Sequence, residues 1–225
     1  RRPWWMLHPP AAVVPTRFWS APERGRVLEL GGGCGLVAAV LASLGADVLC
    51  TDGDPTALRT AAQNCTDAQQ RHDSARCNWG NVRFQELKWG DAEVARAVCR
   101  EHGPFRLIVG SDLLYGIAAP PGPLVETLAA LCVETAAAGS PAEVFVAAKN
   151  RCRNEVEGFT RLAEARGLWR VSLADPEDFT EGFEGRYTSA DGKEECPAYG
   201  IIRLSPRPGT AAAGAPGAAV AAQEA

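Results

Sequence analysis

Short apolar runs alternate along the chain with longer segments in which apolar residues recur every three or four positions. The runs RVLEL at 26–30 and DVLCT at 47–51 have the length and composition of buried β-strands. Between them, over 36–44, leucine and valine residues recur at helical spacing. This part of the sequence therefore predicts a β-α-β unit.

The same alternation continues almost to the end of the chain. We predict further strands at 81–87, 105–110, 142–149, 168–173 and 199–204, and helices at 55–64, 91–101, 122–137 and 153–166. Strands separated by helices of about 10 to 15 residues indicate a mostly parallel sheet with helices on both faces. The predicted fold class is therefore α/β, with seven strands and no internal repeat.

The two ends of the chain differ from this pattern. Residues 1–24 are interrupted by prolines, which oppose a continuous helix, and the sequence starts with Arg1 rather than methionine. We expect an irregular and truncated N-terminal segment here. Residues 207–225 are rich in Ala, Gly and Pro, which predicts a disordered tail. The predicted domain is 25–206.

Composition limits the partners that this domain can have. The 225 residues suit a single domain, and a net charge of −4 offers no basic field for phosphates, so we expect no nucleic-acid partner. Eight cysteines are scattered singly, which predicts neither a metal site nor a disulfide framework and favours the cytoplasm, or the nucleus as well. No apolar run reaches about 18 residues, so we expect no membrane span.

The residues that follow the first predicted strand suggest a cofactor loop. The sequence ELGGGCG places Glu29 before glycines at 31, 33 and 35, and glycine lets a backbone turn sharply and approach a ligand closely. The dinucleotide fingerprint would require a glycine where Leu36 stands, and no Gly-Lys-Ser/Thr of a P-loop follows. Nicotinamide, flavin and nucleoside triphosphate cofactors are therefore disfavoured.

The next two strand ends carry residues suited to an adenosine group. Asp52 lies about 20 residues after the glycine loop, where a carboxylate can accept hydrogen bonds from both hydroxyls of a ribose. Capping of the following helix is assigned to Asp54, because Pro55 follows it. Trp89, after the third strand, could pack against a purine, although taken alone it is more often a packing residue.

The fourth of these strands ends in GSDLLYG, which places Ser111, Asp112 and Tyr115 at the same edge of the sheet. Taken alone, Asp112 could cap a turn and Tyr115 could belong to the core. Together with the other three strand ends, a role in substrate binding is favoured.

These four motifs, in this order, resemble the seven-β-strand S-adenosylmethionine-dependent methyltransferases, a Rossmann-like class. More narrowly, they resemble the family 16 protein-lysine methyltransferases, which modify chaperones, elongation factors and calmodulin. The resemblance covers about residues 25–205. It implies that the following residues bind the cofactor: Glu29, Gly31, Gly32, Gly33, Gly35, Asp52, Trp89 and Ser111. It also implies that Asp112 and Tyr115 match the Asp/Glu-x-x-Tyr/Phe signature of catalysis.

The resemblance implies S-adenosyl-L-methionine as cofactor, a lysine of a chaperone, elongation factor or calmodulin-like protein as substrate, and a monomer. Two alternatives remain open. One is a methyltransferase acting on a small molecule or a nucleobase amine, although Leu113 and Leu114 replace the two prolines typical of nucleobase enzymes. The other is a non-catalytic module that binds the cofactor.

Overall fold

The computed structural model describes residues 25–71, 78–114, 120–149, 153–173, 186–188, 195–197 and 199–208. Its strands are β1 (Arg26–Leu30), β2 (Val48–Asp52), β3 (Val82–Glu86), β4 (Phe105–Ser111), β5 (Glu143–Lys149), β6 (Trp169–Leu173), β7 (Arg186–Thr188), β8 (Glu195–Pro197) and β9 (Tyr199–Pro206). Its helices are α1 (Leu36–Ser43), α2 (Pro55–Gln70), α3 (Ala92–His102), α4 (Pro121–Ala137) and α5 (Arg153–Ala165). The predicted N-terminal segment, residues 1–24, lies outside the described residues, as does most of the predicted tail.

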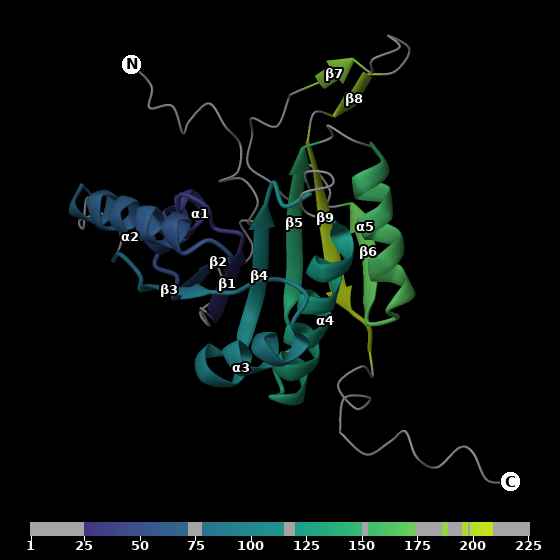
Figure 1. Cartoon of the computed structure of the whole chain (residues 1–225), viewed down its shortest axis with the longest axis horizontal. Helices are drawn as coiled ribbons and strands as arrows, with labels where there is room; N and C mark the ends of the chain where they lie inside the picture. Colours follow the sequence, from purple (N-terminus) through teal and green to yellow (C-terminus); the bar gives the residue numbers. More distant parts are fainter. Residues whose placement is uncertain are drawn as a thin grey trace, which may run out of the picture.

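Seven of the strands form one sheet in the order β3-β2-β1-β4-β5-β9-β6, which confirms the predicted α/β class (Figure 1). Strands β3, β2, β1, β4 and β5 pair in parallel, whereas β9 runs antiparallel to both β5 and β6. The strand order reverses between β1 and β4, which are neighbours in the sheet although two strands separate them in sequence. Ligands of such sheets bind beyond the carboxyl ends of the strands at this point.

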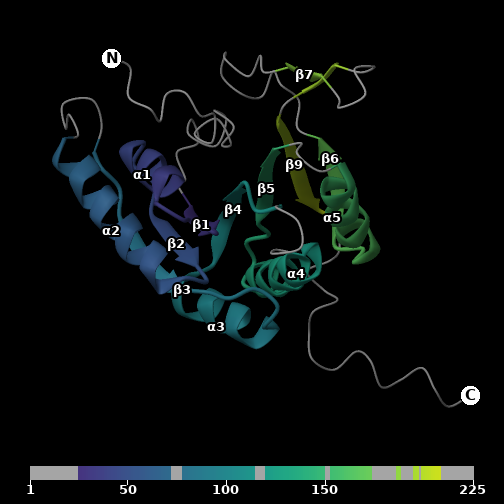
Figure 2. The same cartoon turned by 45° about the horizontal axis from the view of Figure 1, so that its top comes forward.

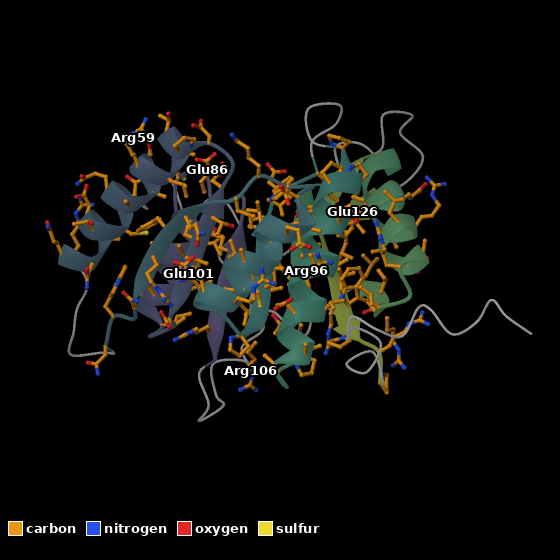
Figure 3. All side chains as sticks on the ribbon, turned by 60° about the horizontal axis from the view of Figure 1, so that its bottom comes forward. Arg59, Glu86, Arg96, Glu101, Arg106 and Glu126 are labelled. Carbon is orange, nitrogen blue, oxygen red and sulfur yellow. The ribbon has the colours of Figure 1, made fainter. Side chains whose placement is uncertain are left out.

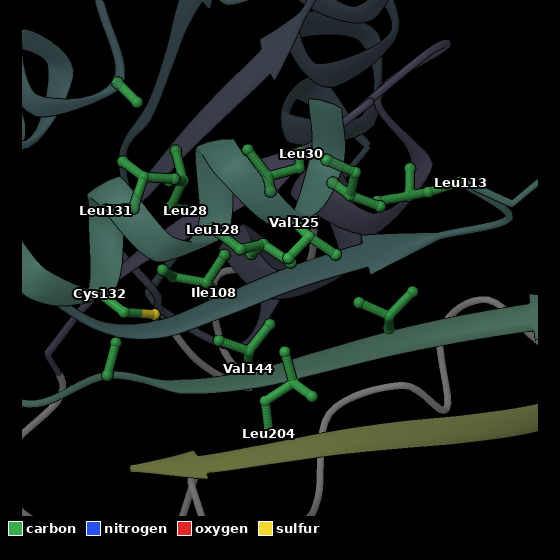
Figure 4. Packing of buried hydrophobic residues seen from close by; sticks show 14 of the residues in the cluster. Leu28, Leu30, Ile108, Leu113, Val125, Leu128, Leu131, Cys132, Val144 and Leu204 are labelled. Carbon is green, nitrogen blue, oxygen red and sulfur yellow. The ribbon is translucent and has the colours of Figure 1, made fainter. Parts of the chain in front are cut away.

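The helices cover both faces of the sheet, as the sequence pattern predicts (Figures 1 and 2). Helices α1 and α2 pack on one face, where Val37, Leu41 and Ala61 share a buried cluster with β1 and β2 side chains. Helices α3, α4 and α5 pack on the other face, and Figure 4 shows Val125 and Leu128 of α4 above the strands. The apolar runs of the sequence are thus buried on both sides, which is why they lack an alternating pattern.

Two elements differ from the sequence-based expectation. Helix α2 runs to Gln70, six residues beyond the predicted end, because its last turns are polar and solvent-facing while Cys65 continues the buried stripe. The short strands β7 and β8 form a separate two-stranded ribbon that the sequence pattern does not predict. Strands of three residues are too short to show a period.

The described charged side chains lie mainly on the outer surface, as Figure 3 shows for α2, α3 and α4. One network, in which Asp47 pairs with Arg26 and Arg83, lies at the amino ends of β1 and β2 and so at the edge opposite the predicted site. No described helix is both long enough and apolar enough to cross a lipid bilayer.

Candidate functional site

The loop between β1 and α1 turns through three glycines with left-handed backbone. The φ angles of Gly31, Gly33 and Gly35 are 61°, 53° and 79°, a region that other residues adopt only at a cost. The N–H of Gly35 donates to the carbonyl oxygen of Gly32 at 2.8 Å, and Gly35 is the residue that precedes α1. The Asn64 side chain donates to the carbonyl of Cys34 at 2.9 Å and so ties the loop to α2.

The glycines of this loop have different surroundings. A Cβ on Gly35 would lie 2.9 Å from the Cα of Ala61, so Gly35 is required for the packing of α1 against α2. A Cβ on Gly33 would meet no atom within 4 Å. The loop therefore packs against protein at Gly35 and faces open space at Gly33.

Asp52, the last residue of β2, holds the loop next to that open space. One of its carboxylate oxygens accepts the N–H of Gly33 at 2.9 Å, and the other accepts the N–H of Asp54 at 2.9 Å. A carboxylate has about four acceptor positions, so each oxygen keeps the capacity for a further donor. Asp54 itself accepts the N–H of Thr56 at 2.7 Å and caps α2, as predicted.

Glu29 is the buried carboxyl of the site. The residue is only 2% exposed, and its Oε2 has no hydrogen-bond partner among the described residues. The pKa of Glu29 is raised from 4.5 to about 8, mainly because burial disfavours the anion, and the negative charge of Asp52 acts in the same direction. Hydrogen bonds to the neighbouring Cys50 side chain and to the backbone of Ala38 lower the pKa of Glu29 but offset only part of the effect of burial. Burial also raises the pKa of the Cys50 thiol.

Trp89 lies over the start of the glycine loop. Its Cζ2 is 3.3 Å from the position that a Cβ on Gly31 would take, and the half-buried ring packs on the cluster beneath α3 and α4. The N–H of Gly90 donates to Oγ1 of Thr127 on α4 at 3.0 Å. This hydrogen bond ties the loop after β3 to α4, and the Trp89 ring lies beside Gly31 of the loop after β1.

The end of β4 completes the edge. Ser111 is in register with Ala147 of β5, and the N–H of Asp112 donates to the carbonyl of Ala147 at 2.8 Å. Asp112 has a φ of 57°, the only left-handed backbone among the described residues that are not glycine, and it is exposed. Tyr115, the second residue of the signature, lies outside the described residues.

The structure thus brings the nine described candidate residues to one edge of the sheet: Glu29, Gly31, Gly32, Gly33, Gly35, Asp52, Trp89, Ser111 and Asp112. Sequence reasoning missed the groups that hold them in place, Asn64 and Thr127. A further missed residue is Thr51, whose buried hydroxyl donates to the carbonyl of Glu29 at 2.7 Å. Single polar residues inside helices or strands carry no sequence signal of this kind.

This edge has donors and acceptors suited to an adenosine-bearing cofactor. It combines an open glycine loop, a carboxylate with spare acceptor positions and a buried, unpartnered carboxyl oxygen. No cluster of three His, Cys, Asp or Glu side chains that could hold a metal occurs in the described part of the chain. The seven-stranded order with an antiparallel β9, together with this site, defines the fold of the S-adenosylmethionine-dependent methyltransferases.

Comparisons with known proteins support this assignment of the fold. The structure is similar to that of an S-adenosylmethionine-dependent methyltransferase from Agrobacterium tumefaciens, with a TM-score of 0.53 and 16% identity, over 85% of this chain and 59% of that one. The sequence model of the lysine methyltransferase family matches residues 18–165, well over half of the chain. The chain therefore belongs to the lysine methyltransferase family.

Two curated relatives carry related names. The chain is 36% identical over 90 residues to the protein N-lysine methyltransferase METTL21A of Danio rerio, which covers 40% of this chain and 37% of that protein. It is 31% identical over 119 residues to the electron transfer flavoprotein beta subunit lysine methyltransferase of Xenopus laevis, covering 50% and 41%. These matches span less than half the length of either relative.

Proposed function

We propose that the protein transfers a methyl group from S-adenosylmethionine to the side-chain amine of a lysine in a protein substrate. Family membership supports this reaction, and both named relatives are lysine methyltransferases. The observation that carries the proposal is the pairing of Gly33 with Asp52. A Cβ on Gly33 would meet no atom within 4 Å, so the loop is open there. The Asp52 carboxylate, which has spare acceptor positions, lies directly beside this opening.

The residues around this opening have complementary roles toward the cofactor, which when bound supplies an electrophilic methyl group on a sulfonium. Asp52 accepts hydrogen bonds from the ribose hydroxyls with its remaining lone pairs. Glu29 faces the positively charged methionine end, where its otherwise unpartnered Oε2 gains a partner. Trp89 packs beside the purine, and Ser111 leaves room between the cofactor and the substrate.

Asp112 and Tyr115 form the substrate side of the proposed site. The ammonium form of lysine, with a pKa of about 10.4 in water, has to lose a proton before it can attack. An anionic Asp112 stabilises the ammonium form, so we assign it first to orientation of the amine and only second to proton acceptance. On the resemblance of the signature, we assign Tyr115 to the binding of the target side chain, where an aromatic ring would favour the methylammonium product. Most of the rate effect then comes from positioning the two reactants.

The proposed substrate is a protein surface that presents a lysine. We propose a chaperone, an elongation factor or a calmodulin-like protein as the substrate, on the resemblance of the motifs. The name of the Xenopus laevis relative adds a flavoprotein subunit as a fourth kind of protein to test. We also propose that the protein acts as a monomer, in the cytoplasm or in the nucleus as well.

Cofactor binding is tested by calorimetry with S-adenosylmethionine. We expect Asp52→Ala to weaken binding at least about tenfold, because two charge-assisted hydrogen bonds to the ribose are lost. The matched control is Asp54→Ala, which removes a neighbouring carboxylate that accepts a backbone N–H but faces α2. Equal losses in the two variants would remove the ribose assignment.

Methyl transfer is tested by incubating the protein with lysate and tritium-labelled cofactor, followed by mass spectrometry of the labelled band. We expect label on a lysine, and we expect Asp112→Asn to bind cofactor normally but to lose labelling. Asp91→Asn is the control, because Asp91 caps α3 and asparagine caps equally well. Label only in RNA or in small molecules would replace the proposed substrate class. Cofactor binding without any label would favour a non-catalytic module.

A further inference from the structure

Leu113 fills a space that two glycines leave between β1 and β4. Its Cδ2 is 2.6 Å from the position of a Cβ on Gly31, and its Cδ1 is 2.3 Å from the position of a Cβ on Gly110. Both distances are too short for any real Cβ, so each glycine is required for Leu113 to lie where it does. Leu113 is 2% exposed and belongs to the core cluster beneath α4, where Figure 4 shows it close to Leu30.

The two glycines belong to different halves of the site. Gly31 opens the glycine loop, whereas Gly110 lies in β4 directly before Ser111 and Asp112. Gly110 is in register with Leu30, the residue before Gly31, so a single leucine side chain spans the junction of the two strands.

The left-handed backbone of Asp112 connects this packing to the substrate side. With a φ of 57° at Asp112, the chain turns so that the Asp112 side chain is exposed while the next side chain, Leu113, is buried. A shift of this turn relative to the glycine loop would press Leu113 against Gly31 or Gly110. Leu114 is equally buried, but it is not among the nearest atoms to either glycine.

We propose that Leu113 is a positioning residue, a wedge that sets the distance between the cofactor loop and Asp112. This inference rests on the proposed function, since it assigns the cofactor to the loop and the substrate amine to Asp112. Because Leu113 is buried, we assign it no contact with either reactant. It acts through the backbone on each side, and the hydrogen bond from the Asp112 N–H to Ala147 holds the far end of the turn.

The wedge predicts a difference in turnover between two neighbouring leucines. We expect Leu113→Ala to lower kcat by about tenfold to a hundredfold, because the reacting groups are displaced relative to each other. Both variants should lose a similar amount of stability, so kcat is measured at a low temperature at which both are folded. There we expect Leu114→Ala to leave kcat nearly unchanged. The affinity for S-adenosylmethionine changes little in either variant, because Asp52 and Asn64 still hold the loop.

A size-exchange cycle tests the contact itself. Gly110→Ala alone should displace Leu113 and lower kcat, since its φ is ordinary and the clash with Leu113 is the severe one. In the Leu113→Ala background the same change should have little further effect, whereas in the Leu114→Ala background its full effect should persist. Independent sites would instead give additive effects within about twofold.

The outcomes separate this inference from the proposed function. Methyl transfer by the wild type, with equal kcat losses for Leu113→Ala and Leu114→Ala or with an additive cycle, would overturn the wedge and leave the function standing. A wild-type protein that neither binds S-adenosylmethionine nor transfers a methyl group would overturn the function and the positioning role with it. Leu113→Val replaces Leu113→Ala where the larger truncation prevents folding.

Discussion

Glu29→Gln should change how the stability of this protein depends on pH. The carboxyl of Glu29 is 2% exposed and carries an oxygen without a hydrogen-bond partner among the described residues. Its pKa is about 8 in the folded protein, against 4.5 as the ordinary value, mainly because burial disfavours the anion. Glutamine keeps the shape of the side chain but cannot ionise.

The direction in which the free energy of unfolding changes with pH depends on whether the folded and the unfolded chain hold the Glu29 proton. Below about pH 4.5 both the folded and the unfolded chain hold the Glu29 proton, and its ionisation costs nothing. Between 4.5 and about 8 only the folded chain holds it, so the free energy of unfolding falls as pH rises. A tenfold change in proton activity is worth about 1.4 kcal/mol, so this contribution falls by about 3 kcal/mol from pH 5 to pH 7. The full loss, complete above about pH 8, is about 5 kcal/mol.

Urea denaturation of the wild type and of Glu29→Gln at pH 5, 6 and 7 measures this contribution. We expect the variant to gain stability relative to the wild type by about 3 kcal/mol over that range. Glu86→Gln, at the exposed end of β3, is the control and should track the wild type. A constant difference between the wild type and Glu29→Gln at all three pH values would show that Glu29 is ionised throughout and that its burial is compensated.

Three further predictions concern the same edge of the sheet. Gly33→Ala and Gly35→Ala both place alanine at a positive φ, which costs about 1 to 2 kcal/mol, but only the alanine at position 35 also collides with α2. Thermal denaturation should therefore show a much larger loss of stability for Gly35→Ala. Calorimetry should show weaker cofactor binding by the folded Gly33→Ala. Binding of S-adenosylmethionine should tighten from pH 6 to pH 8 in the wild type, because its positive charge favours ionised Glu29, and calorimetry of Glu29→Gln should show a flatter dependence. Thr127→Val should cost about 0.5 to 1.5 kcal/mol of unfolding free energy in urea denaturation, because the hydrogen bond from the Gly90 N–H to Thr127 is lost. An unchanged free energy of unfolding would show that this hydrogen bond contributes nothing to stability.

Much of the fold follows from local patterns. The strand at 26–30 has the bounds that were predicted, and the six others in the main sheet lie within one or two residues of them, because each is a short apolar run beside a helix of different period. The end of α2 was wrong by six residues, since polar exposed turns look alike in a helix and in a loop. The β7–β8 ribbon was missed for a similar reason, because three-residue strands show no period.

In the candidate site as well, the sequence shows the local motifs but not the surroundings of each residue. Glycines at 31, 33 and 35 and an acid at 52 are visible as motifs, because turns and carboxylates at strand ends are local features. Their separate tasks are not visible in the sequence. Gly33 faces open space and Gly35 packs on Ala61, which depends on how α2 crosses the loop.

The sequence by itself determined the order of strands and helices, the strand ends that carry polar residues, and the resemblance to a methyltransferase family. Only the tertiary structure decided which of those strand ends are neighbours. It also decided that Glu29 is buried with a raised pKa and that Leu113 fills the gap between Gly31 and Gly110. The physical reason is that burial and close contact between β1 and β4 join residues about 80 positions apart, and a local pattern carries no information about such contacts.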